Sequence, residues 1–362
     1  MTAPPHLLEP HDEPLRRWLA QQGQGAYRAA QVRSWLYEKR AANFDDMTDL
    51  GKELRGQLAQ DFTLWTTEIA KHSVAEDGTE KLLLALNAGQ SDSTKPDKPS
   101  WMQRIECVLL REEARRTICI SSQVGCAMGC VFCASGLDGV ERNLTSGEIV
   151  EQMLRLARLL PADERLSHIV VMGMGEPLAN LDRLLPALEM ASREDGLGIS
   201  PRRITISTVG LPAAIDRLSE INARFQLAVS LHAPDDDLRN ELVPVNKNIG
   251  LDAILKSADH YFEVSGRRLT FEYVLLADIN DQAEHAHKLA KLLRGRHALL
   301  NVIPYNPVAG LPYRTPSGKA IERFREILEH AGINVQFRHR KGDKINAACG
   351  QLRRSSVVEL AT

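Results

Sequence analysis

Apolar positions follow two different periods along this chain, and their alternation predicts most of the fold. From about residue 117, short β-branched or apolar runs are each followed by a stretch with apolar residues at helical spacing. The first pair is TICISS and SGEIVEQMLRLARLL, and the last is LLNVIPYN and KAIERFREILEHA, before a final strand NVQFR. Six such β-then-α units predict an α/β fold with a parallel sheet and crossover helices. Their number favours a partial (β/α)6 barrel, with a doubly wound open sheet as the alternative.

The residues before this repeat have a different pattern. Residues 14–40 contain apolar residues at helical spacing and predict two helices, and LGKELRGQLA predicts a third with Asp49 as its N-cap. WTTEIAKHSVA, EKLLLALN and RIECVLL are typical of strands. The pattern therefore predicts a small N-terminal helical accessory domain over 1–75, a strand-rich extension over 76–116 with a flexible loop at 89–100, a barrel over 117–340, and a C-terminal segment over 341–362.

Composition narrows the class of protein but not its function. The 362 residues are 43% hydrophobic and 25% charged, which is typical of a soluble globular chain. No apolar run approaches the length of a membrane span, and the start MTAPPHLLEPHDEP does not resemble a signal peptide, so we expect a cytoplasmic location. The net charge of −2 gives no overall basic signal, and any contact with nucleic acid must come from local clusters. One basic cluster spans residues 14–40, and a second comprises Arg338, Arg340, Lys341, Lys344, Arg353 and Arg354.

The strongest chemical motif is CAMGCVFC, which places Cys126, Cys130 and Cys133 directly after the first strand of the repeat. A [4Fe–4S] cluster normally takes four cysteines. Three ligands leave one iron open, and an open iron can chelate the amino and carboxylate groups of S-adenosylmethionine (SAM). A zinc site would require a fourth ligand with its own short pairing, and no second CxxC or HxxxH is present. The spacing therefore favours an iron–sulfur cluster over structural zinc or unconnected thiols.

A second motif, HIVVMGMGEP, ends the next strand with Gly173, Gly175 and Glu176. One interpretation is a tight turn, since glycine adopts backbone conformations that other residues avoid. The other is close approach of the backbone to a ligand, with Glu176 accepting a hydrogen bond from the SAM amino group.

Taken together, these motifs resemble a known family. The CxxxCxxC loop with Phe132 before its last cysteine is similar to that of the radical SAM superfamily. SSQVGCAMGCVFCASG, VVMGMGEPLAN, ISTVG, AVSLHAP, IPYNP and DKINAACGQL resemble the adenine-methylating RlmN/Cfr family, in order, from about 104 to 352. The resemblance implies a radical SAM barrel in which SAM is held by Gly175, Glu176, Ser207, Ser230, Leu231, His232 and Asn306.

Cysteines outside the triad need a separate interpretation. Strand alternation places Cys119 on the face opposite Ile118 and Ile120, and Cys349 lies far downstream in AACGQL. Taken alone, each is interpreted as a small buried hydrophobe, as Cys107 is. The resemblance instead implies that Cys349 takes a methyl group from one SAM and becomes a methylene radical after a second SAM is cleaved at the cluster. Cys119 would then release the product by forming a disulfide with Cys349.

The same resemblance implies one further residue role and the partners of the reaction. It implies that Glu106 accepts the ring proton, although an exposed strand carboxylate is the simpler interpretation of RIECVLL. A reductant such as flavodoxin with its reductase must restore the two thiols, and we expect the chain to act as a monomer. The basic residues around Cys349 and the N-terminal helices are the expected RNA contacts. The target base must leave any stack to enter a barrel.

The function predicted from these features is methylation of C2 of an adenosine in 23S rRNA, and of the adenosine 3′ to the tRNA anticodon. C2 lies between two ring nitrogens and is electron-poor, so a carbon radical can add where a simple methyl transfer cannot succeed. The nearest alternative is the C8-methylating branch of the same family; Val124 in SSQVGCA, where a cysteine would mark that branch, and LVPVNK favour C2. A radical SAM peptide-modifying enzyme, or a zinc-dependent RNA-binding module, remains open as another class.

Overall fold

The computed structural model describes residues 4–86, 103–221, 224–338 and 345–352. The predicted loop at 89–100 lies outside the described residues, and so does the second basic cluster apart from Arg338. Among the helices that are described, none combines the length and the apolar character needed to cross a bilayer.

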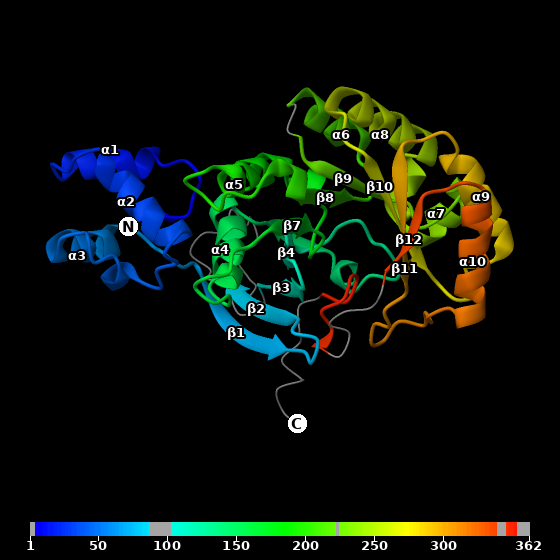
Figure 1. Ribbon diagram of the computed structural model, residues 1–362, viewed down its shortest axis with the longest axis horizontal. Coiled ribbons are helices and arrows are strands. Elements are labelled where there is room, and N and C mark those ends of the chain that lie inside the picture. Colours follow the sequence, from blue (N-terminus) through cyan, green and yellow to red (C-terminus); the bar gives the residue numbers. More distant parts are fainter. Residues whose placement is uncertain (1–3, 87–102, 222–223, 339–344, 353–362) are drawn as a thin grey trace.

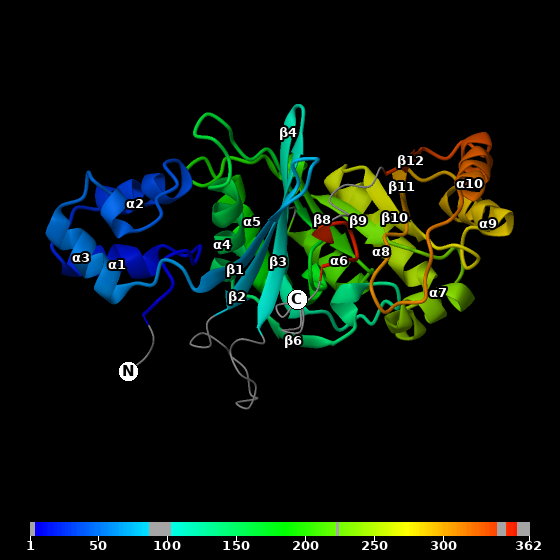
Figure 2. The same ribbon diagram turned by 90° about the horizontal axis from the view of Figure 1, so that it is seen from below.

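A ten-stranded sheet organises the chain, in the order β1-β2-β3-β4-β7-β8-β9-β10-β11-β12. Its parallel part follows the chain order without reversing at a switch point, as a barrel does and a doubly wound sheet does not. The predicted α/β fold with a partial six-unit barrel is confirmed, and Figure 2 shows the sheet curving round. The parallel strands are β4 (Arg115–Cys119), β7 (His168–Val171), β8 (Ile204–Thr208), β9 (Gln226–Ser230), β10 (Leu269–Leu275), β11 (Ala298–Pro304) and β12 (Val335–Phe337).

Helices follow the parallel strands and cover the outside of the curved sheet (Figure 1). They are α4 (Ser146–Ala157), α5 (Leu181–Ser192), α6 (Pro212–Glu220), α7 (Asp236–Leu242), α8 (Leu251–Ser265), α9 (Ala283–Leu293) and α10 (Gly318–His330). Sequence features explain their limits. A capping box of Thr145 and Glu148 begins α4, and Gly266, with a φ of 62°, ends α8 in the left-handed conformation that favours glycine.

Three further strands extend the sheet beyond the barrel. β1 (Thr67–Val74), β2 (Glu80–Leu86) and β3 (Arg104–Glu112) pair antiparallel with one another, and β3 pairs antiparallel with β4. A separate two-stranded sheet of β5 (Gln123–Gly125) and β6 (Val140–Asn143) flanks the cysteine loop. The antiparallel strands therefore add a wall beside β4, the first strand of the barrel, which ends with Cys119.

The N-terminal helices α1 (Glu13–Gln21), α2 (Tyr27–Tyr37) and α3 (Lys52–Asp61) form a group at one end of the molecule (Figure 1). The predicted N-cap of α3 is wrong. Gly51 occupies the cap position, and Asp49 instead accepts a hydrogen bond from the indole of Trp35. A cap must immediately precede the first helical residue, and because α3 begins at Lys52, Asp49 lies two positions before the cap.

Two basic residues of the first cluster join these helices to the barrel. The buried Arg33 pairs with Asp12 and with Asp195, which follows α5. The Arg40 guanidinium donates to the backbone carbonyls of Leu160 and Pro161 after α4. These two arginines therefore hold the N-terminal helices in place and are not free to bind phosphate.

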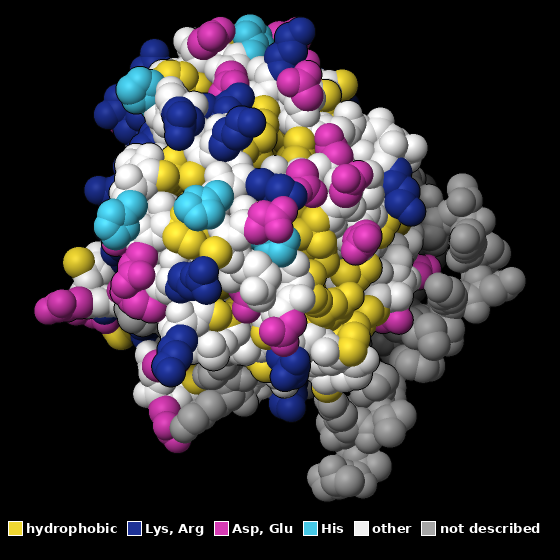
Figure 3. Space-filling model, turned by 90° about the vertical axis from the view of Figure 1, so that its right-hand side faces the viewer, with side chains coloured by type: hydrophobic (Ala, Val, Ile, Leu, Met, Phe, Trp, Pro, Cys, Tyr) yellow, Lys and Arg dark blue, Asp and Glu magenta, His cyan; other side chains and the backbone are white. Residues whose placement is uncertain are grey.

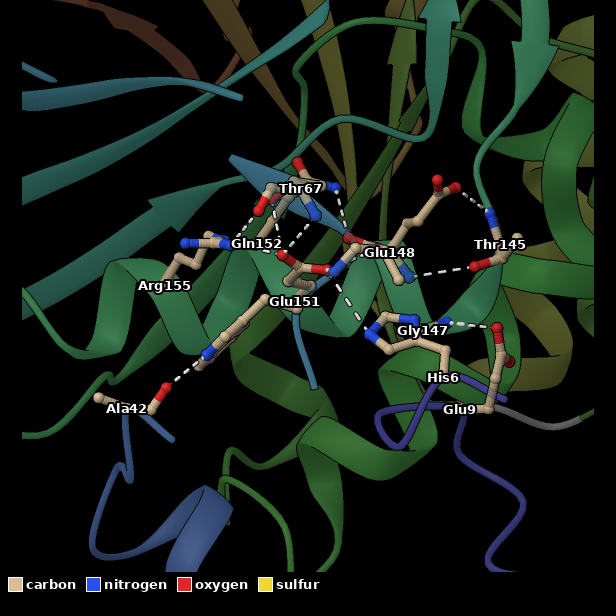
Figure 4. A network of polar contacts seen from close by, with 12 residues as sticks. His6, Glu9, Ala42, Thr67, Thr145, Gly147, Glu148, Glu151, Gln152 and Arg155 are labelled. Atoms are coloured by element: carbon tan, nitrogen blue, oxygen red, sulfur yellow. Dashed lines mark hydrogen bonds and ion pairs between the residues drawn. The ribbon is translucent and has the colours of Figure 1, made fainter. Parts of the chain in front are cut away.

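A buried carboxylate marks the same junction. Glu151 of α4 is fully buried, and its two oxygens accept hydrogen bonds from the backbone and hydroxyl groups of Thr66 and Thr67, at 2.6–3.1 Å (Figure 4). Arg155, one turn further along α4, donates to the same carboxylate at 2.8 Å. The ring of His6 lies 3.5 Å from it, and burial lowers the pKa of His6. One acid thus ties the N-terminal segment and the start of β1 to the barrel.

We predict that Glu151→Ala lowers the free energy of unfolding by about 3–5 kcal/mol, because it leaves Arg155 and buried N–H groups without their acceptor. Urea unfolding followed by circular dichroism measures this change. Glu263→Ala, at an exposed position of α8, is the matched control and should stay within about 0.5 kcal/mol of the parent. A loss at Glu151 no larger than the control's would show that the carboxylate does not stabilise the junction.

Candidate functional site

A cavity opens at the carboxyl ends of the parallel strands, where a barrel gathers its functional side chains. It holds about 960 Å³ of empty space, part of which is open to solvent. Ten of the residues singled out in the sequence line it together: Cys126, Cys130, Cys133, Gly175, Glu176, Ser207, Ser230, His232, Asn306 and Cys349. Leu231, Cys119 and Glu106 are buried nearby without forming part of its lining.

The cysteine loop places hydrogen-bond donors against its own sulfurs. The backbone N–H of Met128 points at Cys126, and the N–H groups of Ser135 and Gly136 point at Cys133. Burial raises the pKa of the Cys126 thiol to about 12 and that of Cys130 well above its ordinary value, and each donor acts in the opposite direction where it is present. Donors of this kind favour the thiolate, which is the form that binds iron.

The three thiols are close enough for the charge of one to raise the pKa of another, as Cys126 and Cys133 both do for Cys130. In the part of the chain that the structure describes, no three Cys, His, Asp or Glu side chains converge tightly enough to hold a single metal ion. A [4Fe–4S] cluster does not require such convergence, because each thiolate binds a different iron atom. The donor set and its N–H groups fit three ligands of such a cluster.

Close backbone packing shapes the turn after β7. A Cβ on Gly173 would lie 2.7 Å from the Ile120 carbonyl oxygen, and one on Gly175 would lie 2.6 Å from Gln123. The φ of Gly175 is +105°, which side chains rarely adopt. Both interpretations of this motif therefore have support: the turn is tight, and its backbone borders the cavity.

Glu176 is already held by the backbone around it. Its carboxylate accepts from the N–H of Leu178 at 3.1 Å and from the N–H of Val209 at 2.9 Å. Burial raises its pKa, and these hydrogen bonds act against that effect. A carboxylate has about four acceptor positions, so Glu176 retains capacity for an ammonium group in the cavity.

His232 adopts a left-handed backbone with a φ of 60°, which is uncommon outside glycine. Its Nδ1 accepts from the N–H of Val274 at 3.1 Å, and its ring packs edge-on against Phe132 of the cysteine loop at 4.8 Å. Burial, with a smaller contribution from the charge of Arg239, lowers the pKa of His232 to about 3. The ring is therefore neutral near pH 7, with its proton on Nε2.

Arg239 of α7 holds the strand ends that carry these residues. It is fully buried and donates to the carbonyls of Leu231 and Ser230 at 3.0 Å, and also to the carbonyl of Val209. The carbonyls of Ser230 and Leu231 lie at the end of β9 and just after it, and the carbonyl of Val209 follows β8. Ser230 of β9 and Ser207 of β8 line the cavity. Leu231 contributes here through its backbone.

The segment that carries Cys349 lies across the open side of the barrel (Figure 1, red). Asn306, after β11, donates to the carbonyl of Cys349 at 3.2 Å, and the N–H of Ala134, next to the last cluster cysteine, donates to the carbonyl of Gly350 at 2.8 Å. The hydroxyl of Ser135 donates to the Leu352 carbonyl at 2.6 Å. The cysteine loop and the far end of the sheet thus bring Cys349 into the cavity.

Cys119 lies within range of the charge of Cys349. Burial, with a smaller contribution from Cys349, raises the pKa of the Cys119 thiol to about 12. Burial also raises the pKa of Cys349, while the Arg338 guanidinium beside both thiols acts against it. All six cysteines are free thiols. The charge of Cys349 thus reaches Cys119, although the two residues are 230 positions apart in the numbering.

Comparison with known proteins is consistent with this geometry. The Radical SAM superfamily matches residues 120–290, and the Ribosomal RNA large subunit methyltransferase N-terminal domain matches residues 6–64. A probable dual-specificity RNA methyltransferase RlmN from Rhodopirellula baltica is 63% identical over 99% of this chain and 93% of its own length. The chain belongs to the RlmN family. A Bacillus licheniformis relative with the same description is 42% identical over 97% of this chain and 94% of its own length.

A solved structure is similar to this RlmN-family chain over nearly its whole length. The crystal structure of a radical SAM methyltransferase from Sphaerobacter thermophilus superposes with a TM-score of 0.90 at 41% identity, covering 97% of this chain and 100% of that one. The radical SAM barrel implied by the motifs is therefore confirmed.

Sequence reasoning missed a second acid in this RlmN-family site. Glu272 of β10 lines the cavity, is only 3% exposed, and accepts from Asn301 of β11 at 3.0 and 3.1 Å. A single acid inside the apolar run RLTFEYVLL was the available signal, since a buried carboxylate requires partners. Glu106 is also buried, at 3% exposure, so the interpretation as an exposed strand carboxylate is wrong.

Proposed function

We propose that this RlmN-family protein methylates C2 of an adenosine in 23S rRNA and of the adenosine 3′ to the tRNA anticodon. One observation carries the proposal: Cys349, outside the cluster motif, lines the same cavity as Cys126, Cys130 and Cys133. A peptide-modifying radical enzyme needs the three cysteines but not the fourth. The description of the relatives as dual-specificity RNA methyltransferases favours RNA over a peptide as the substrate.

Cys126, Cys130 and Cys133 would hold a [4Fe–4S] cluster, and Glu176 would accept from the ammonium group of SAM. Asn306, whose buried Oδ1 has no hydrogen-bond partner among the described residues, and the hydroxyls of Ser207 and Ser230 would hold the rest of SAM. The cluster and SAM, when bound, supply a methyl group and an organic radical, using two SAM molecules per turnover. The neutral His232 adds no positive charge near the sulfonium.

Three residues of the chain would carry the transfer to the base. Cys349 as a thiolate would accept the methyl group in a nucleophilic displacement, and once the organic radical has removed one hydrogen atom from that group, its carbon would bond to C2 of adenine. The adduct would give one electron back to the bound cluster. Cys119 would then attack the sulfur of Cys349, so that a disulfide forms as the carbon–sulfur bond breaks, and the freed carbon would take up a proton to become the methyl group of the base. Glu106, on the same wall as Cys119, accepts the proton from the ring. An external donor such as flavodoxin with its reductase returns the disulfide to two thiols.

RNA would approach from the side of the cavity. Arg338, beside the two thiols, is exposed and supplies positive charge there. The face over α9 and α10 mixes Lys and Arg with Asp and Glu and forms no single basic surface (Figure 3). The N-terminal helices, at the other end of the molecule, are the better candidate for a second contact. We propose that a monomer acts in the cytoplasm, where both RNAs are found.

Mapping methyladenosine by mass spectrometry tests this function. The anaerobically reconstituted enzyme is incubated with SAM, a reductant, and either 23S rRNA or tRNA. We expect 2-methyladenosine in both RNAs, and about four iron and four sulfide per chain. Formation of 8-methyladenosine would select the C8 branch, and zinc without sulfide would select the zinc-dependent RNA-binding module. Either result would refute the proposal.

A further inference from the structure

One lysine of the antiparallel wall contacts both the buried acid and the segment that carries Cys349. The ammonium of Lys81, on β2, lies 2.7 Å from an oxygen of Glu106 on β3. The same ammonium donates to the backbone carbonyl of Asn346 at 3.0 Å, across 265 positions of sequence. The side chains of Lys81 and Glu106 are 11% and 4% exposed. Water therefore competes little for the ion pair, whereas the contact with Asn346 lies at the surface.

Strand register places this ion pair on the same face as Cys119. Lys81 pairs with Val108, and Val108 pairs with Cys119, so the three side chains form a row across the antiparallel strands. Glu106 lies two positions before Val108 on β3 and therefore points to the same face. The lysine, the acid and the thiol all face the side on which the C-terminal segment lies.

The contact with Asn346 lies just before Cys349. Asn346 has a φ of 51°, in the left-handed region, so its carbonyl direction depends on a backbone conformation that most residues avoid. Beyond Cys349, the segment is held by Ser135 and by Gln351, which donates to the Pro307 carbonyl at 2.9 Å. Lys81 supplies the charged contact on the other side of the reacting residue.

We propose that Lys81 is a positioning residue. Its ammonium group contacts both the Glu106 carboxylate and the segment that carries Cys349, and so fixes their positions relative to each other. This inference rests on the proposed function, since it assigns a role to Glu106 and Cys349 in that reaction. An ion pair that served only the packing of β2 on β3 would not need the second contact with Asn346. The two roles differ in what happens to the C-terminal segment when the charge is removed.

Hydrogen exchange of the purified cluster-containing protein tests the contact with the segment. Lys81→Met removes the charge at similar length, and we expect a peptide covering residues 345–352 to exchange about tenfold faster, the change that loss of one hydrogen bond to a charged group produces. Lys81→Arg should stay within about twofold of the parent, because it keeps the charge and its donors. Lys71→Met, at an exposed position of β1, is the matched control and should change nothing. Unchanged exchange in Lys81→Met would overturn the proposal.

Kinetics of the same variants test the positioning role. In Lys81→Met we expect kcat for RNA methylation to fall about a hundredfold, within the range of losses that a misplaced reacting group gives. The KM for RNA and the formation of 5′-deoxyadenosine from SAM should stay near the parent values, and Lys81→Arg should restore most of kcat. Lys81→Met with normal kcat, or a loss that appears only in KM, would contradict the role.

Failure of the proposed function and failure of the positioning role of Lys81 give different results. If the parent enzyme makes no methyladenosine, the proposed function fails, whereas the exchange experiment still reports whether Lys81 holds the segment. If the parent is active and Lys81→Met is equally active, only the positioning role of Lys81 fails.

Discussion

Cys349→Ala is expected to abolish RNA methylation while leaving the iron–sulfur cluster and the reductive cleavage of SAM intact. In the proposed mechanism the side chain supplies the sulfur that accepts the methyl group, so its loss removes the acceptor itself. The backbone contacts of this segment, from Asn306 to the carbonyl at 349 and from Ala134 to that of Gly350, do not use the sulfur and should persist. Iron and sulfide analysis, chromatography of 5′-deoxyadenosine, and mass spectrometry of RNA measure the three properties separately.

Cys107→Ala is the matched control for this variant. Cys107 lies on β3 close to Cys119, is fully buried in the apolar core and lies outside the cavity lining. Its replacement leaves a small void and lowers stability slightly, but methylation should continue. Methyladenosine formed by Cys349→Ala at a rate similar to that of Cys107→Ala would refute the role of Cys349 and reopen the peptide-modifying alternative.

Cys119→Ala is expected to accumulate RNA bound covalently to the protein through Cys349. Cys119 of β4 lies within range of the charge of Cys349, and in the proposed mechanism its thiol attacks the sulfur of Cys349. Without that attack no disulfide forms, and the base stays attached. Denaturing gels should show a protein–RNA band, and mass spectrometry of the digested complex should identify a nucleotide on the peptide that contains Cys349.

The double variant Cys119→Ala/Cys349→Ala is the control, because it removes both the attacking thiol and the site of attachment. It should form no adduct and no methyladenosine. Free unmodified RNA without an adduct in Cys119→Ala alone would count against the resolving role of Cys119, even if Cys349 proved essential.

The periodic pattern predicted the larger part of the fold correctly. Six strand–helix units and a last strand were expected from residue 117 onward. The described residues contain six parallel strands that are each followed by a helix, with β12 after them, because burial on both faces of a parallel strand leaves a continuous apolar run in the sequence. The error at Asp49 has a local cause. The cap position depends on the residue at which the helix begins, and α3 begins at Lys52. The side chain of Asp49 instead accepts a hydrogen bond from Trp35.

The candidate site was predictable where the chemistry lies within a short motif. Cys126, Cys130 and Cys133 are close in sequence, and Gly175, Ser207 and Ser230 each lie at or just after the end of a predicted strand. The carboxyl ends of parallel strands share one edge, so these residues had to lie near one another. The residues that hold them were missed. Arg239 resembles any other charged residue of a short helix until its carbonyl partners are known.

By itself, the sequence determined which chemistry this protein can support: three closely spaced thiols, strands that end in polar residues, and two further cysteines whose roles the family resemblance implied. Only the tertiary structure decided that the charge of Cys349 reaches Cys119, that Glu272 lines the same cavity as Cys349, and that Lys81 contacts the segment that carries Cys349. The physical reason is that hydrophobic period and motif spacing are local properties of the chain. Contacts between residues 200 or more positions apart arise from the closure of the sheet and the path of the last segment across it, which no local pattern encodes.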